Sequence, residues 1–484
     1  MIKTEIPVEF WQRHRLVPLG QENGRLTVGV DESTPIEVLE DVRLTLNKDV
    51  RPVKMSPEEL DDALRRLVLN TDAPSIEEDD DEGSVSLDAS SDLMGDAAGA
   101  PVVRLINSMF LRAMQTGASD IHIEPFEEDT VVRMRIDGML HETTRVPRSR
   151  HSQIAARLKV MSKLDLAESR RPQDGRLHVH SGDRHIDVRL SSVPTLHGER
   201  LVMRLLEKNM ELLSLEQVGM LNDTEKSINE ILDHPYGLFL VTGPTGSGKT
   251  TTLYSVLDKL RSPDCNLITI EDPVEYRVAG VGQIQVNEKI GLTFASGLRS
   301  VLRQDPDVLM VGEIRDPETA DIAIHAALTG HMVLSTLHTN DAPAAATRLV
   351  DLGVPSYLLS SCLVGVLAQR LVRKLCSHCK KESELTKNDT KRLGLREDLA
   401  GRTIYEPGGC EKCLQTGYRG RTGVFELMTV EEELASMIAR SEDARTLRSA
   451  ARKHGMFSLM EDAARKVIQG VTSREEAMRV TKAI

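Results

Sequence analysis

The chain has 484 residues, 40% of them hydrophobic and only 3% aromatic, so length and composition predict about three domains with aliphatic cores. The formal net charge is −13, but residues 72–99 hold ten acidic and no basic residues, and the remainder sums to only −3. This balance excludes a chain that is basic throughout, as nucleic-acid-binding domains tend to be, and no apolar run approaches the roughly 18 residues of a membrane-spanning helix.

Residues 1–71 are predicted to form a small α/β module. Residues 26–30 alternate as in a half-buried strand, and a capping box at Ser56-Pro57-Glu58-Glu59 opens a helix predicted to run through residue 69. Charged residues stand near the N-terminus where a signal peptide needs its apolar region, so we expect a cytosolic protein. The module has no catalytic motif, and the sequence leaves open whether it docks a partner or only stabilises the chain.

An acidic segment at residues 72–99 follows, with an unbroken run of Asp and Glu at residues 77–82. Such a composition buries too little apolar surface to order itself, so we expect a flexible, self-repelling linker. An acidic docking segment is the alternative interpretation.

Residues 100–213 are predicted to form a second domain, an antiparallel sheet with helices. An apolar stripe from Val102 to Ala113 indicates a helix that stops at Gly117, and Asp137-Gly138 is typical of a hairpin turn. The domain is crowded with arginines, whose planar guanidinium groups suit phosphate binding. These are Arg133, Arg135, Arg170, Arg171, Arg176, Arg189, Arg200 and Arg204.

The motor domain, residues 214–484, contains the strongest motif of the chain, a phosphate-binding loop between an apolar strand and a helix. The predicted nucleotide-binding residues are Gly243, Pro244, Thr245, Gly246, Ser247, Gly248, Lys249, Thr250 and Thr251. Lys249 is expected to reach the β and γ phosphates of ATP, and the Thr250 hydroxyl to ligate Mg²⁺.

Polar residues follow the other apolar runs, at 267–270, 308–311 and 332–334, where an open parallel sheet binds its ligands. Glu313 stands where a magnesium-side aspartate is usual, and suits activation of the attacking water. Glu271 competes for this role. His338 is either a sensor of the γ-phosphate or a structural hydrogen-bonding residue.

Two Cys-x-x-Cys pairs, Cys376 with Cys379 and Cys410 with Cys413, can supply four thiolates to one structural Zn²⁺. Their separation implies an inserted hairpin or helix, which defines a zinc module at residues 374–415. Small amphipathic helices are predicted beyond it, at residues 429–484.

With these motifs in hand, residues 101–484 resemble the family of secretion and type IV pilus assembly ATPases. The matching stretches are ASDIHIEP at 118–125, RPQDGR at 171–176, GERLVMRLL at 198–206, GPTGSGKTTTLY at 243–254, ITIEDPVEY at 268–276, LRSVLRQDPDVLMVGEIRD at 298–316 and TGHMVLSTLHTND at 329–341.

The resemblance implies a multidomain α/β protein with a PAS-like second domain and a RecA-like motor domain. It also implies that the chain forms a homohexamer and binds nucleotide between the second domain and the motor domain. It implies phosphate contacts from Arg189 and Arg204, further arginine contacts from Arg299, Arg303 and Arg315, and hydrolysis with Glu313 and Glu271. It also implies attachment to the inner membrane through residues 1–71, which would bind the cytoplasmic domain of one platform protein, and a polytopic platform protein as a second partner.

The single short N-terminal module favours type II secretion, with ATP hydrolysis driving pseudopilus assembly and export. The alternatives are a type IV pilus extension motor, a DNA-translocating hexamer and an ATP-binding scaffold without turnover. We expect no nucleic-acid partner, because the globular parts are near neutral in charge.

Overall fold

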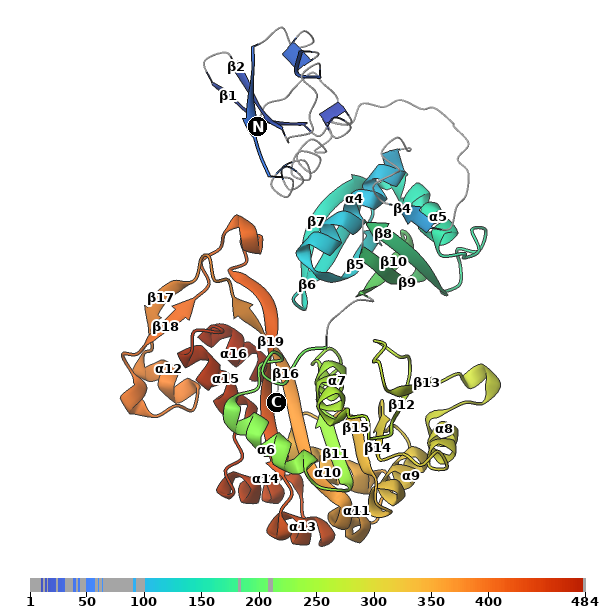
Figure 1. Ribbon diagram of the computed structural model, residues 1–484, viewed down its shortest axis with the longest axis vertical. Helices are drawn as coiled ribbons and strands as arrows, with labels where there is room; N and C mark the ends of the chain where they lie inside the picture. The colour runs from blue at the N-terminus through green and yellow to red at the C-terminus, as the bar shows by residue number, and fades with distance from the viewer. Residues whose placement is uncertain are drawn as a thin grey trace. The chain divides into compact units, whose positions relative to one another are not determined.

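The computed structural model describes residues 10–11, 14, 16–22, 25–30, 38–40, 42–43, 49–56, 60, 63, 90–92, 101–181, 184–207 and 212–481. The chain divides into two compact units, residues 1–134 with 141–205 and residues 135–140 with 206–484 (Figure 1). Among the helices of the described ranges, none is long and apolar enough to cross a membrane.

The N-terminal module contains a three-stranded sheet of β1 (Leu16–Glu22), β2 (Arg25–Val30) and β3 (Val50–Lys54). β1 and β2 are antiparallel and β3 runs parallel to β2, so the strand predicted at residues 26–30 is confirmed as the central one. Trp11 is fully buried in its core. Most of the helix predicted up to residue 69 lies outside the described residues.

Most of the predicted acidic linker also lies outside the described residues. Its residues 90–92 form β4 (Ser90–Asp92), which pairs in parallel with a strand of the second domain. The composition argument is therefore wrong for this short stretch, because strand pairing uses backbone groups and needs no apolar side chains.

The second domain is a seven-stranded sheet in the order β4-β8-β9-β10-β5-β6-β7. Its further strands are β5 (Ala118–Pro125), β6 (Asp129–Ile136), β7 (Met139–Pro147), β8 (Gln173–Ser181), β9 (Arg184–Thr195) and β10 (Gly198–Glu207). Its helices are α4 (Pro101–Thr116), η1 (Arg148–Arg150) and α5 (His151–Met161). The stop at Gly117 and the turn at Asp137-Gly138 are both confirmed, with positive φ angles at all three residues.

The motor sheet has the order β13-β12-β14-β15-β11-β16-β19, and all pairs are parallel except β16 with β19. Its strands are β11 (Gly237–Thr242), β12 (Leu267–Glu271), β13 (Gly282–Gln285), β14 (Val308–Val311), β15 (Met332–Leu337), β16 (Leu363–Leu375) and β19 (Tyr418–Thr429). The predicted parallel-type sheet is thereby confirmed.

Helices cover both faces of this sheet (Figure 1). The helices of this part of the chain are α6 (Asn222–Leu232), α7 (Lys249–Leu260), α8 (Phe294–Val301), α9 (Pro317–Leu328), α10 (Ala342–Asp351) and α11 (Ser356–Cys362), and the short η2 (Glu288–Ile290) is exposed. Successive strand residues point to opposite faces. Leu238 and Leu240 accordingly belong to one apolar cluster, whereas Phe239 and Val241 belong to the cluster under α6 and α7.

The cysteine-bearing insertion and the last helices complete the chain. The insertion contains β17 (Lys381–Glu384), α12 (Lys387–Arg392), η3 (Glu397–Leu399), β18 (Thr403–Glu406) and η4 (Glu411–Cys413). The predicted insertion is therefore both a strand pair and a helix. The C-terminal helices are α13 (Glu432–Ala439), α14 (Ala444–Lys453), α15 (Leu459–Ile468) and α16 (Arg474–Thr481).

Candidate functional site

The phosphate loop connects β11 to α7, as the sequence predicts (Figure 1). Gly243, Gly246 and Gly248 have φ angles of 148°, 77° and 87°, which residues with a Cβ rarely adopt. The hydroxyl of Ser247 is buried and has no hydrogen-bond partner within the described ranges. A turn of this kind with an unused donor is the geometry that accepts a phosphate group.

Lys249 begins α7 and is only 9% exposed. Its Nζ donates hydrogen bonds of 2.7 Å and 3.3 Å to the carbonyl oxygens of Gly243 and Pro244. Burial lowers the pKa of Lys249 to about 8, and the negative charge of Glu313 partly opposes this shift. An anionic phosphate beside Lys249 would favour its charged form. The next residue, Thr250, is exposed, so its hydroxyl is accessible for the predicted Mg²⁺ ligation.

Glu313 lies just after β14 and contacts two other predicted site residues, Arg315 and His338. One carboxylate oxygen pairs with the guanidinium of Arg315, and the other lies 3.4 Å from Nε2 of His338. The Glu313 side chain is 13% exposed and that of His338 is 49% exposed. Glu313, Arg315 and His338 therefore form one cluster at the strand ends, and the charge of Glu313 also acts on Lys249. Their roles in hydrolysis remain predictions.

Glu271, the competing carboxylate, ends β12 and is buried. It accepts hydrogen bonds from the Tyr254 hydroxyl, from Thr269 Oγ1 at 2.5 Å and from Gln283 Nε2 at 3.2 Å. Burial raises the pKa of Tyr254, and the bond to Glu271 adds to the shift. Three neutral donors therefore occupy the Glu271 carboxylate, which favours Glu313 as the group that contacts a water molecule.

The strand predicted from the apolar run at residues 332–334 is longer than the sequence indicates. β15 continues to Leu337, so Ser335 and Thr336 lie inside the strand instead of after it. Their hydroxyls donate to the carbonyl oxygens of Val311 and Gly312, at 2.8 Å and 2.7 Å. In a strand buried on both faces a hydroxyl must find such a partner, and these two therefore hold β15 against the segment that carries Glu313.

Gln369 on β16 forms the floor of the phosphate loop, and the sequence analysis missed it. A Cβ on Gly243 would lie 2.4 Å from the Gln369 carbonyl oxygen, and one on Gly248 would lie 2.8 Å from its Nε2. Thr252 on α7 donates to its Oε1. The available signal was the first of two polar pairs in this strand, Gln369-Arg370, which follows an apolar run at residues 363–368.

Two further predicted contacts, Arg299 and Arg303, have other partners. Arg299 pairs with Glu318 at 2.5 Å, and Arg303 donates to the carbonyl oxygen of Arg299 at 2.8 Å. The structure thus brings Arg315, but not these two, to Glu313.

The arginines expected to reach the phosphates from the second domain lie in the first unit, whereas the phosphate loop lies in the second. Arg204 on β10 pairs with Asp120 at 3.0 Å, and its side chain is 63% exposed. Arg189 on β9 forms no hydrogen bond or ion pair with any described residue. Arg189 is therefore the better available phosphate ligand, and its role remains a prediction.

The four predicted zinc ligands lie together. Sγ–Sγ distances are 3.9 Å for Cys376–Cys410 and 3.7 Å for both Cys379–Cys413 and Cys410–Cys413, and all four thiols are free. A tetrahedral ion with Zn–S bonds of about 2.3 Å needs sulfur atoms about 3.8 Å apart. The cluster therefore fits Zn²⁺, and four sulfur ligands leave no open position for catalysis.

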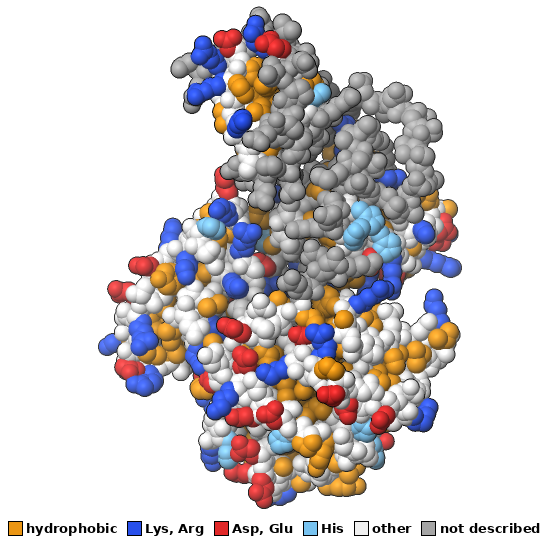
Figure 2. Space-filling model, in the orientation of Figure 1, with side chains coloured by type: hydrophobic (Ala, Val, Ile, Leu, Met, Phe, Trp, Pro, Cys, Tyr) orange, Lys and Arg blue, Asp and Glu red, His pale blue; other side chains and the backbone are white. Residues whose placement is uncertain are grey.

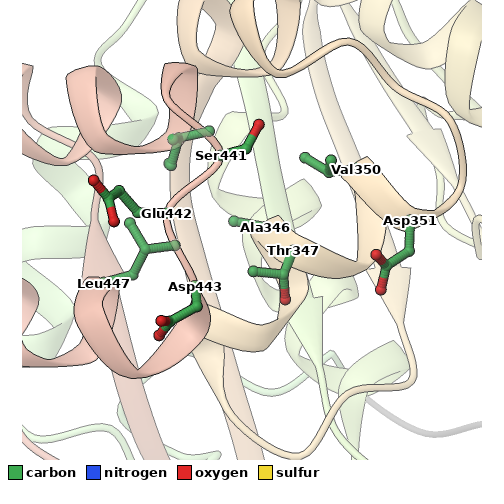
Figure 3. A pocket seen from close by; sticks show the side chains of 9 residues that line it. Ala346, Thr347, Val350, Asp351, Ser441, Glu442, Asp443 and Leu447 are labelled. Atoms are coloured by element: carbon green, nitrogen blue, oxygen red, sulfur yellow. The ribbon is translucent and has the colours of Figure 1, made fainter.

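A hollow of about 140 Å³ lies between α10 and the α13–α14 segment (Figure 3). Asp351, Glu442 and Asp443 lie around it, and no residue of the phosphate loop lines it. Its carboxylates would repel phosphate groups, so it is not a second nucleotide site.

A family model described as type II/IV secretion system protein matches residues 96–479, and a model of the MshEN domain matches residues 1–74. The chain is 44% identical over 495 residues to the type II secretion system protein E of Dickeya dadantii, covering 99% of this chain and 98% of that protein. It is 43% identical over 489 residues to the type II secretion system ATPase E of Vibrio cholerae, covering 99% and 96%.

Among solved structures, the pilus retraction motor PilT with bound ADP is similar, with a TM-score of 0.51 and 27% identity. The match covers 77% of this chain and 95% of PilT.

Proposed function

The chain belongs to the family of type II/IV secretion system proteins, and from this premise we propose that it powers pseudopilus assembly and protein export by a type II secretion system. As a member of this family it is a secretion ATPase. ATP is the proposed substrate, bound by the loop from Gly243 to Thr250, with Arg189 and Arg204 closing on the phosphates in a homohexamer.

One observation carries the chemistry: Glu313, whose charge acts on Lys249, lies 3.4 Å from His338, and the Ser247 hydroxyl of the loop has no partner in the described parts of the chain. Lys249 would exchange the carbonyl oxygens of its own loop for the β and γ phosphates. Glu313 would orient the attacking water and accept its proton, held by Arg315 and His338. Thr250 is the residue that would hold Mg²⁺, which neutralises charge on the phosphates when bound.

The zinc module and the N-terminal module have proposed roles outside the chemistry. Cys376, Cys379, Cys410 and Cys413 would hold a structural Zn²⁺. Residues 1–71 would bind the cytoplasmic domain of an inner-membrane platform protein and so attach the ATPase to the membrane, and the motor would act on a polytopic platform protein.

The test is ATP hydrolysis by the purified full chain, alone and with the cytoplasmic domain of the platform protein. We expect turnover that needs Mg²⁺, rises with the partner and is lost in Lys249→Ala. Lys226→Ala is the matched control, because Lys226 is an exposed lysine on α6. Turnover that DNA stimulates and the partner does not would favour the translocase alternative, and no turnover under any condition would favour a scaffold.

A further inference from the structure

The β8–β9 hairpin carries a ladder of polar side chains on one face. Its cross-strand pairs are Arg176↔Arg189, His178↔Asp187 and His180↔His185. The alternating residues on the opposite face are buried apolar side chains: Leu177, Val179, Ile186 and Val188. Since successive side chains of a strand point to opposite faces, the ladder faces away from the domain core.

Three histidines and one aspartate form two adjacent rungs of this ladder. Nδ1 of His178 lies 2.5 Å from Oδ1 of Asp187, and Nδ1 of His180 contacts Nδ1 of His185. The two imidazole rings of the second rung are 4.5 Å apart, at 79° to each other. Figure 2 shows a patch of histidine side chains on this part of the surface. The function proposed above uses none of these four residues.

Imidazole nitrogens are good ligands for divalent transition metals and poor ones for Mg²⁺ or Ca²⁺. Two His nitrogens bound to one tetrahedral Zn²⁺ at about 2.0–2.1 Å lie about 3.3 Å apart. Directly opposite residues of an antiparallel pair have Cβ atoms about 4.5–5.5 Å apart, which lets His180 and His185 converge on one ion. The next rung is about 7 Å along the strand, within reach of a rotated Asp187 side chain.

We propose that His180, His185 and Asp187 form a binding site for one divalent transition-metal ion, with Zn²⁺ the best-fitting ion. His178 is not a ligand: its ring contacts the Asp187 carboxylate in the metal-free chain, and metal binding would exchange this contact for the ion. The site is separate from the cysteine cluster: it lies in the other unit of the chain and offers nitrogen and oxygen ligands instead of sulfur. It does not rest on the proposed function.

The test is titration of the metal-free full chain with Co²⁺ as a spectroscopic probe, and then with Zn²⁺ by calorimetry. Cobalt bound by the cysteines gives intense sulfur-to-metal charge-transfer bands, whereas cobalt in a His and Asp site gives only weak d–d bands. We expect two equivalents per chain, the second without charge-transfer bands. His180→Gln and His185→Gln should each lose the second equivalent and keep the first.

His178→Phe should retain the second equivalent, because the contact between His178 and Asp187 is broken when the metal binds. His141→Gln is the matched control, since His141 lies on β7 at the opposite edge of the same sheet. All four substituted histidines are at least partly exposed, so folding is expected to survive and is checked by circular dichroism. The proposal is wrong if no second equivalent binds, or if it binds equally well to His180→Gln and His185→Gln.

Discussion

The hydroxyl of Thr252 donates a 2.7 Å hydrogen bond to the side-chain oxygen of Gln369. Both residues are buried, at 0% and 2% exposure, and the bond joins α7 to β16. Gln369 also lies against the phosphate loop, where a Cβ on Gly248 would lie 2.8 Å from its side-chain nitrogen. The position of the loop is thus set by a strand more than one hundred residues further along the chain.

Replacing Gln369 by Leu should weaken ATP binding, because it leaves the Thr252 hydroxyl buried without its partner. An unpaired buried group of this kind costs about 1–3 kcal/mol. The measurements are the dissociation constant for ATP and the thermal midpoint of the full chain. The double variant Gln369→Leu with Thr252→Val should be less damaged than the sum of the single variants. Strictly additive effects would show that the bond does not support the loop.

This contact marks the limit of what the sequence could predict. The phosphate loop, the strand before it and the Cys-x-x-Cys pairs are local patterns, and each fixes its own backbone geometry. Gln369 supports Gly248 only after β16 pairs with β11, and no local pattern encodes that pairing. The same holds for the cross-strand pair of His180 and His185, which becomes visible only once the register of β8 and β9 is known.

Glu313→Gln should retain ATP binding and lose about 10²–10³-fold in turnover, because the amide keeps the shape but cannot accept a proton. Glu271→Gln provides the comparison. Its carboxylate is held by Tyr254, Thr269 and Gln283, so loss of its charge should act on the geometry of the site. Tyr254→Phe should then reproduce the defect of Glu271→Gln and leave Glu313 in place. Parent-level turnover by Glu313→Gln would remove Glu313 from the proposed role.

Nucleotide affinity should fall as the pH rises from 7 to 9. Burial lowers the pKa of Lys249 to about 8, so the free protein loses the ammonium charge in this range. The phosphates bind the charged form, and binding near pH 8 should therefore take up a proton. Calorimetry of ADP binding in two buffers with different ionisation enthalpies measures this uptake.

Lys249→Arg is the control for this pH dependence, because the guanidinium stays charged throughout the range. It should bind ADP with a different affinity but without proton uptake near pH 8. An affinity of the parent chain that is constant between pH 7 and 9 would contradict the prediction.

The purified chain should contain one Zn²⁺ at the cysteine cluster. Serine at any one of the four positions should release the metal and unfold the module locally, while the motor still binds nucleotide. Cys265→Ser is the matched control, because Cys265 is a free cysteine outside the cluster. The measurements are metal analysis, thiol titration and hydrogen exchange of residues 374–415. A purified protein that contains no zinc and has four titratable thiols in this module would contradict the prediction.

The last prediction concerns how the second domain couples to the motor. If Arg189 and Arg204 reach the phosphates, ATP must bind the closed arrangement more tightly than the open one, because otherwise no closure follows. Hydrolysis should then be slow in monomers and faster when subunits are held in a ring. The measurement is ATPase activity of each variant in an enforced hexamer.

Arg189→Ala is the decisive variant, because Arg189 has no partner within the described ranges and its removal leaves no protein group unpaired. It should lower hexamer activity by about 10²-fold or more, as loss of one such charge-stabilising group does. Arg204→Ala also exposes the buried carboxylate of Asp120, so Arg204→Gln is measured beside it to separate lost catalysis from lost stability. Arg145→Ala, on β7 and paired with Asp129, is the control for a surface arginine of the same sheet. If Arg189→Ala and Arg204→Gln both keep full activity in the hexamer, these arginines only solvate the face of the sheet. The energy of hydrolysis must then reach the second domain through another contact.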